Sequence, residues 1–216
     1  KYDVSIKYFN FRKLSLSCHI QPPLYARESA KFQKTEVGMA YRLALYVDRA
    51  KALDSALCIR VNQTSRYQLI RVWFRLVSRL GDGVFWYTVM LGIVATQGMS
   101  GVFPVLHMAS VGLVGTVFYK WIKGKTLRPR PYEVHQDIWL TGRPLDRFSF
   151  PSGHTLHAVA FSTVALFYYP VLFPVVVPFA VMVALSRVVL GLHYPSDVII
   201  GALIGLSLST ISLMIL

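Results

Sequence analysis

Apolar stretches dominate the second half of the chain. They cover residues 84–96, 102–121, 155–169, 175–186 and 198–216, and short turns or polar loops separate them. A helix needs about 20 apolar residues to cross a bilayer, so the second and fifth stretches are long enough and the others need their flanking residues. The pattern predicts an all-α, multipass membrane helical bundle with about five transmembrane helices.

The preceding segment, residues 38–80, alternates apolar and basic positions at helical spacing. Arg71, Arg75 and Arg79 recur every four residues beside an apolar face that contains Trp73. This pattern is typical of a helix lying on an anionic membrane surface, and equally of a helix packed on its own protein. A sixth crossing within residues 38–60 is disfavoured by the charges at Arg42, Asp48, Arg49 and Lys51.

The first 37 residues show no clean period, and we expect an irregular or partly strand-like segment there. Gly81-Asp82-Gly83 breaks the helical pattern before the first apolar stretch. We therefore divide the chain into two parts. Residues 1–80 form a basic N-terminal segment with amphipathic, interfacial helices, and residues 81–216 form a transmembrane domain.

Charge is distributed unevenly. Hydrophobic residues make up 54% of the 216 and charged residues only 15%, against roughly 25% in ordinary soluble domains. The turns at 97–101 and 168–174 carry no charge, so every charged residue fits on one membrane face. The net charge of +13 borders apolar spans, so an anionic lipid or substrate fits it better than nucleic acid does. Cys18 and Cys58 match no metal or redox spacing and read as unpaired thiols.

Polar motifs on that face carry the candidate chemistry. Lys123 is followed seven residues later by Arg130 and a proline. The sequence Pro-Ser152-Gly153-His154 precedes the third apolar stretch. Ser-Arg187 is followed by His193 and then by Asp197. No tight cluster of His, Asp and Glu indicates a metal site, and we expect no cofactor.

These residue types suit the hydrolysis of a phosphate ester. Arg130 and Arg187 offer forked donors to phosphate oxygens, and Lys123 adds a point charge. Ser152 is a good N-cap residue, so a helix starting there would aim free N–H groups at an anion. Pro195 favours a helix start, which would place Asp197 in the first turn and within reach of His193. A carboxylate on one imidazole nitrogen leaves the other free to attack.

Together the motifs match the tripartite signature KX6RP–PSGH–SRX5HX3D, and the chain resembles the type 2 phosphatidic acid phosphatase (PAP2) superfamily over about residues 84–216. The resemblance implies that His193 is the nucleophile, that Asp197 orients it and that His154 protonates the leaving group. It also implies that the phosphoryl group is held by the remaining motif residues, Lys123, Arg130, Ser152, Gly153 and Arg187. Lys125, Arg128 and Arg143 either attract anions or solvate the polar loop, and His107 receives no role.

The resemblance implies a metal-independent lipid phosphatase in a bacterial cytoplasmic membrane. Its candidate substrates are polyprenyl phosphates or diphosphates, phosphatidic acid, phosphatidylglycerol phosphate and lipid A phosphate. The stretch at residues 78–83 resembles the polyprenyl branch. Alternatives are a silent lipid-binding or scaffold relative, a vanadate-dependent peroxidase-like enzyme and a small transporter, the last disfavoured because its polar residues would lie at mid-membrane. The side of the membrane that the site faces, protein partners and oligomeric state stay open.

Overall fold

The computed structural model describes residues 24–215. Helix α1 runs over Leu24–Asn62, directly after Pro22-Pro23, so the irregular or strand-like prediction is wrong for residues 24–37. The same prediction for residues 1–23 falls outside the described residues. Good helix formers, Ala, Lys, Glu, Gln and Leu, fill much of the first turns of α1 and explain the helix. The chain divides into two units between Val47 and Asp48, and the second unit contains all five apolar stretches.

All five apolar stretches form helices, which confirms the all-α class for the described residues. Helix α2 covers Gln68–Arg79 and a π-helical turn, η2, covers Leu80–Val84. The later helices are α3 Phe85–Gln97, α4 Val102–Thr126, α5 Pro131–Val134, α6 Gly153–Tyr168, α7 Phe173–Val189 and α8 Pro195–Ile215. Short 3-10 turns lie at Gln63–Arg66 (η1), Gly98–Gly101 (η3) and Pro170–Leu172 (η4).

Several of these helices suit a bilayer. By length and composition, three helical stretches can cross a membrane, namely Gln68–Val134 (which joins α2 to α5), Pro170–Val189 and Pro195–Ile215. Large apolar side chains also face outward along the bundle, for example Leu113 and Met214. Water would penalise so much exposed apolar surface, whereas lipid does not. The number of about five crossings stays a prediction.

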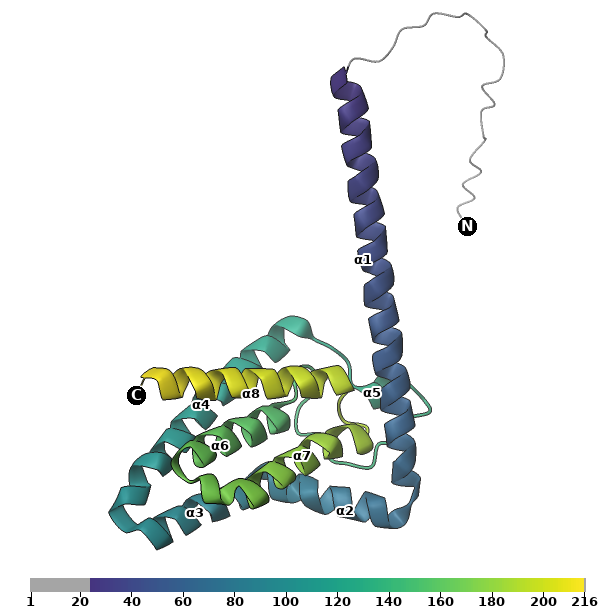
Figure 1. Ribbon diagram of the computed structural model, residues 1–216. Helices are drawn as coiled ribbons and strands as arrows, with labels where there is room; N and C mark the ends of the chain where they lie inside the picture. Colours follow the sequence, from purple (N-terminus) through teal and green to yellow (C-terminus); the bar gives the residue numbers. More distant parts are fainter. Residues whose placement is uncertain (1–23, 216) are drawn as a thin grey trace, which may run out of the picture. The chain divides into compact units, whose positions relative to one another are not determined.

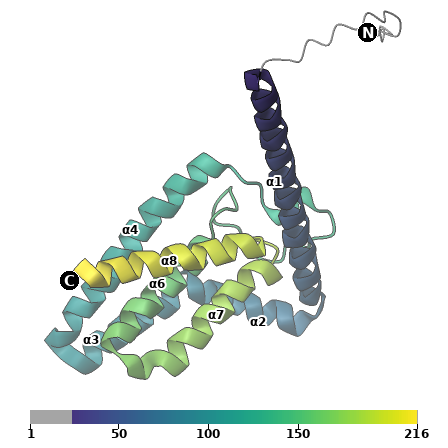
Figure 2. The same cartoon turned by 45° about the horizontal axis from the view of Figure 1, so that its top comes forward.

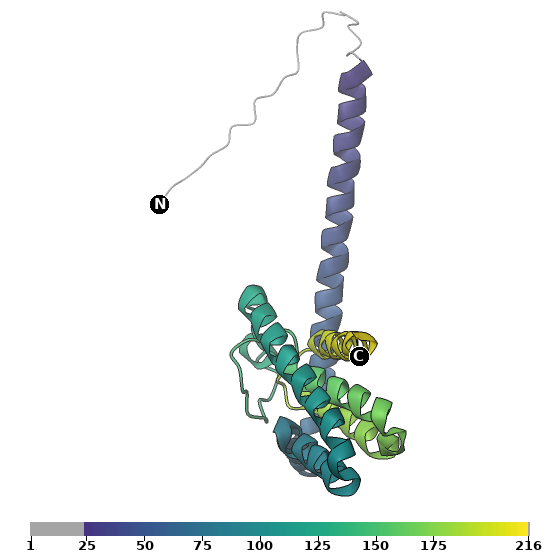
Figure 3. The same ribbon diagram turned by 90° about the vertical axis from the view of Figure 1, so that its left-hand side faces the viewer.

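Helix α6 is the centre of the bundle and packs against α4, α7 and α8, while α2 packs against α7 (Figures 1 and 2). Glycines let α8 approach closely. A Cβ atom added at Gly201 would lie 2.5 Å from the carbonyl oxygen of Ser152, and one at Gly205 would clash with the carbonyl oxygen of Leu156. This packing brings the start of α8 against the start of α6, and Figure 3 shows α8 nearly end-on beside α4 and α6.

The uncharged turns η3 and η4 lie at one end of the bundle, and the starts of α6 and α8 lie toward the opposite end (Figure 1). The polar segment between α4 and α6 is at that opposite end too, although α4 extends into it as far as Thr126 and α5 forms inside it. The residues of all three motifs therefore come from one end of the helices.

Candidate active site

The start of α6 presents backbone donors. Ser152 is the N-cap, and its Oγ atom accepts from the backbone N–H of Thr155 at 3.5 Å. The N–H groups of Gly153 and His154, in the first turn, have no acceptor within the helix, as is general for the first turn. The backbone N–H of Ser152 donates to the carbonyl oxygen of Asp197 at 3.1 Å, which joins the second motif to the third.

Cationic side chains of the first and third motifs are buried almost completely. Lys123, Arg130 and Arg187 are 5%, 1% and 2% exposed. Lys123 Nζ lies 2.6 Å from Asp146 Oδ2. Burial, the largest single influence, raises the pKa of Asp146, but the hydrogen bond and charge of Lys123, together with the charges of Arg130 and His154, lower it below its usual value.

The two arginines have no carboxylate within ion-pair distance among the side chains described in residues 41–215. Arg130 donates to the carbonyl oxygens of Asp146 at 2.9 Å and Leu192 at 2.8 Å. Arg187 donates to the hydroxyls of Ser78 and Ser186. Burying a charge without a counter-charge is unfavourable in free energy, so binding of an anion beside the two guanidinium groups would stabilise this region.

The predicted nucleophile and its orienting carboxylate are neighbours. His193 Nδ1 lies 3.7 Å from Asp197 Oδ2, and this buried nitrogen has no hydrogen-bond partner among the described residues. Burial lowers the pKa of His193 to about 3, the charges of Arg130 and Lys123 act in the same direction, and Asp197 opposes them. The imidazole is therefore neutral at physiological pH, as a nucleophile must be.

The carboxylate of Asp197 is fully buried and held by several donors. Oδ2 accepts from the backbone N–H of Tyr194 at 2.9 Å and from the hydroxyl of Ser149. Oδ1 accepts from Arg128 Nη1 at 2.6 Å. We expected Arg128 either to attract anions or to solvate the loop. That expectation is corrected, because the guanidinium group is bonded to the buried carboxylate of Asp197.

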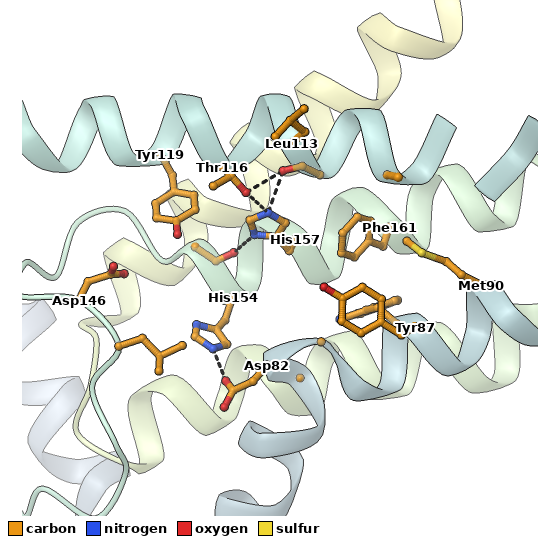
Figure 4. A pocket seen from close by; sticks show the side chains of 17 residues that line it. Asp82, Tyr87, Met90, Leu113, Thr116, Tyr119, Asp146, His154, His157 and Phe161 are labelled. Atoms are coloured by element: carbon orange, nitrogen blue, oxygen red, sulfur yellow. Dashed lines mark hydrogen bonds and ion pairs between the residues drawn. The ribbon is translucent and has the colours of Figure 1, made fainter. Parts of the chain in front are cut away.

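His154 has a partner that its sequence motif does not include. Its Nε2 atom lies 2.5 Å from Oδ1 of Asp82, which comes from the π-helical turn η2 (Figure 4). Gly83, the next residue, has a φ of 137°, a conformation that favours glycine and directs the turn toward α6. Two sequence signals include this residue, the Gly-Asp-Gly break and the likeness of residues 78–83 to the polyprenyl branch, and neither indicated His154 as the partner.

A cavity of about 430 Å³ opens beside His154 (Figure 4). Polar groups of Asp82, Asp146 and His154 lie among its walls, and Gly153 borders it. His193, Arg130, Arg187 and Lys123 are buried outside its lining. The rest of the wall is largely apolar and aromatic, including Trp86, Tyr87, Met90, Leu113 and Phe161. The cavity thus combines a polar region at the motif residues with an apolar region between helices.

A second cavity, of about 560 Å³, shares Asp82 and Leu145 with the first. Three arginines line it, Arg75 and Arg79 from α2 and Arg143 from the polar loop. Arg75 Nε donates to the carbonyl oxygen of Thr141 at 2.5 Å. Asp82 is the only acidic residue in its lining, so the cavity carries a net positive charge.

Two other histidines connect helices. His107, to which no role was given, lies within hydrogen-bond distance of Tyr168 at 3.0 Å and Ser212 at 2.7 Å, and so ties α4 to α6 and α8. His157 lies 3.0 Å from the carbonyl oxygen of Gly112 and 2.8 Å from that of Gly153. Sequence spacing gave no signal for the contacts with Tyr168, Ser212 and Gly112, because these partners are 45 to 105 positions away along the chain.

This arrangement of motif residues accompanies a match to the sequence profile of the PAP2 superfamily over residues 100–216, which is more than half of the chain. The chain belongs to the PAP2 superfamily. The matched region contains all three motifs, the central helix α6 and the pair His193–Asp197. Helices α1 to α3, with Asp82, lie before it.

Known relatives agree with this assignment. The chain is 35% identical over 100 residues to the undecaprenyl-diphosphatase BcrC of Bacillus subtilis (strain 168). Those residues are 46% of this chain and 51% of BcrC, so the chain spans about half the length of the curated relative that it matches.

Solved membrane structures share the fold. The crystal structure of LpxE from Aquifex aeolicus superposes with a TM-score of 0.63 at 27% identity, covering 74% of this chain and 93% of LpxE. A transmembrane PAP2 type phosphatidylglycerolphosphate phosphatase from Bacillus subtilis gives a TM-score of 0.58 at 24% identity, covering 77% and 86%. The bundle of this chain is thus an integral membrane PAP2 fold.

Proposed function

We propose that this protein is a membrane phosphatase that hydrolyses a lipid phosphate or diphosphate through a phosphohistidine intermediate. The observation that carries the proposal is the pair of buried guanidinium groups, Arg130 and Arg187, without a carboxylate partner in the described part of the chain. A phosphoryl group would supply the missing negative charge and accept forked hydrogen bonds. Ser152, Gly153 and Lys123 complete the proposed cradle.

In the first step His193 attacks phosphorus. The neutral imidazole uses Nε2, because Nδ1 faces Asp197. A nitrogen–phosphorus bond forms and the bond from phosphorus to the leaving oxygen breaks. His154 gives its proton to that oxygen, and Asp197 stabilises the positive charge that develops on His193.

In the second step a water molecule attacks the phosphohistidine. His154, now neutral, takes the proton of the water, the nitrogen–phosphorus bond breaks, and inorganic phosphate leaves. Both histidines return to their starting states, so the cycle balances with water as the only co-reactant. No metal is needed in this scheme.

For the substrate we propose a polyprenyl diphosphate. The name of the relative BcrC and the likeness of residues 78–83 to the polyprenyl branch support this choice. The apolar wall of the first cavity suits an isoprenyl tail, and the arginines of the second suit a headgroup with more negative charge than one phosphate. Bacterial cytoplasmic membranes, where polyprenyl carriers act, are the proposed location.

Phosphate release by detergent-purified protein tests the proposal. The panel contains polyprenyl diphosphate, polyprenyl monophosphate, phosphatidic acid, phosphatidylglycerol phosphate and a soluble phosphomonoester, each with and without EDTA. His193→Ala is the blank. Turnover of the diphosphate that resists EDTA and disappears in the blank supports the function, and trapping of acid-labile phosphate on the wild-type protein supports the intermediate.

The alternatives predict other outcomes. A silent lipid-binding relative would release no more phosphate than the blank from any substrate. A peroxidase-like enzyme would need bound vanadate and would oxidise halide with peroxide. If phosphatidic acid is turned over fastest, the proposed phosphatase activity stands and phosphatidic acid replaces polyprenyl diphosphate as the proposed substrate.

A further inference from the structure

One face of α1 contacts the segment that carries His193 and Asp197. Asp54, Cys58 and Asn62 follow one another at intervals of four residues, which places them on the same side of a helix. All three are partly or fully buried and bond to residues around the nucleophile. The matched PAP2 region begins at residue 100, so this face lies outside the family profile.

Asp54 caps α8 from another helix. Its Oδ1 atom accepts from the backbone N–H of Ser196 at 2.9 Å, and its Oδ2 atom accepts from the hydroxyl of the same serine. Ser196 is the second residue of α8, where N–H groups lack acceptors and negative charge is favourable. The carboxylate therefore fixes the turn that contains Asp197.

Asp54 also reaches Asp197 through a guanidinium. Arg128 Nη2 lies 2.8 Å from Asp54 Oδ2, and Nη1 of the same arginine lies 2.6 Å from Asp197 Oδ1. The guanidinium stacks over the ring of Tyr194 at 4.0 Å, which restricts its position further. With Oδ1 of Asp197 engaged in this way, Oδ2 is the oxygen that faces His193.

The other residues of this face hold the backbone of the loop. The Cys58 thiol donates to the carbonyl oxygen of His193 at 3.7 Å, and burial raises the pKa of that thiol to about 12, so the donor proton stays in place. The Asn62 side-chain amide donates to the carbonyl oxygens of Val189 at 2.9 Å and Trp139 at 3.0 Å. The loop is thus tied to α1 on both sides of His193.

We propose that Asp54 is a positioning residue of the phosphatase reaction, which acts through Arg128 and Ser196 to hold the Asp197 carboxylate toward His193. The inference rests on the proposed function and adds a part of the site that the three motifs do not contain. Without Asp54, Arg128 loses one of its two anchors and the first turn of α8 loses its cap. Asp197 then samples orientations in which Oδ2 no longer faces His193.

The test uses the full chain in detergent, with kcat and KM measured on polyprenyl diphosphate and Tm measured in parallel. We expect Asp54→Asn and Arg128→Gln each to lower kcat about 10- to 100-fold with KM changed less than about twofold, since each removes a hydrogen bond to a charged group. The double variant should be no slower than the slower single variant, because both act on one relay. Asp54→Glu should recover part of the loss, whereas Arg128→Lys should recover little because an ammonium cannot make the fork.

Asp48→Asn is the matched control, an exposed aspartate on the same helix with no ion pair among the side chains described in residues 41–215. An unchanged kcat in Asp54→Asn overturns the proposal, as does an additive loss in the double variant. A raised KM at constant kcat in Arg128→Gln overturns it too, since Arg128 would then bind substrate directly. If Asp54→Asn does not fold, Asp54→Glu and Arg128→Lys decide the same question at a preserved Tm. Wild-type turnover equal to that of His193→Ala would instead overturn the proposed function itself.

Discussion

Asp82 Oδ1 lies 2.5 Å from His154 Nε2, although the two residues are 72 positions apart. The contact joins the π-helical turn before α3 to the first turn of α6. Burial and the charge of Arg187 lower the pKa of His154 to about 4, and the hydrogen bond and charge of Asp82 oppose this change. The carboxylate therefore fixes the ring of the proposed general acid and favours its protonated form, which the negative charge of a bound phosphoryl group would favour further.

Asp82→Asn should therefore impair protonation of the leaving group. We expect kcat on a lipid phosphate, whose leaving alkoxide needs the proton, to fall about 10- to 100-fold. Hydrolysis of p-nitrophenyl phosphate, whose leaving group needs little protonation, should fall less than about threefold. Asp137→Asn, an exposed aspartate of the polar loop, is the control, and an equal loss on both substrates would contradict an acid-specific role.

The role of Arg130 and Arg187 should depend on the forked guanidinium group and not on positive charge alone. We expect Arg130→Lys and Arg187→Lys to lower kcat/KM at least about 100-fold, since lysine keeps the charge but cannot bind two phosphate oxygens at once. Binding of vanadate, a phosphate analogue, should weaken in parallel. Arg60→Lys, an exposed position on α1, should leave both unchanged, and wild-type-like vanadate binding in both site variants would count against the cradle.

The low pKa of His193 predicts a pH-dependent stability. The folded-state pKa is about 3 and the ordinary value is 6.5, so the unfolded chain binds the proton first as the pH falls. The part of the free energy of unfolding that depends on a neutral His193 is therefore fully present above pH 6.5, and it is lost progressively as the pH falls from 6.5 to 3. Between about pH 7.5 and about pH 5.0 the wild type should lose about 2 kcal/mol more than His193→Asn, measured by denaturant titration in detergent. Equal losses in the two proteins would show that His193 does not titrate in this way.

Alanine should have different effects at two glycines, because only Gly205 lies at the contact between α8 and α6. Gly205→Ala should destabilise the protein by about 1–3 kcal/mol, because the new methyl group meets the backbone of Leu156. Gly92→Ala, in α3, meets nothing within 4 Å and should be neutral or stabilise by up to about 1 kcal/mol. Thermal unfolding in detergent distinguishes them, and an unchanged Tm for Gly205→Ala would contradict the close approach of the helices.

The second, basic cavity predicts substrate discrimination. In Arg79→Gln/Arg143→Gln we expect kcat/KM on polyprenyl diphosphate to fall about tenfold, and on polyprenyl monophosphate about twofold or less, because the extra charge of the diphosphate loses its partners. Arg66→Gln/Arg71→Gln is the control, since neither residue lines the cavity. Equal losses on both substrates would assign the arginines a general role at the membrane surface.

Sequence alone determined the helices and the motif residues, for physical reasons that are local. Runs of apolar residues such as 102–121 and 198–216 must form helices in lipid, because backbone groups need partners within the segment. Pro195 and Ser152 mark helix starts through their own backbone preferences. The proximity of Asp197 to His193 follows from their spacing at such a start.

Tertiary structure alone decided what holds the motif residues in place. Asp82, Arg128 and Asp54 have partners 69 to 142 residues away, and no local pattern encodes such a contact. From sequence, charged residues in a polar loop or on an amphipathic helix are interpreted as solvated or as bound to lipid headgroups, because the sequence gives their charge but not their neighbours in space. Only the close packing of α6 with α8, and the hydrogen bonds from Asp54 of α1 to the start of α8, bring these carboxylates and guanidinium groups to the site.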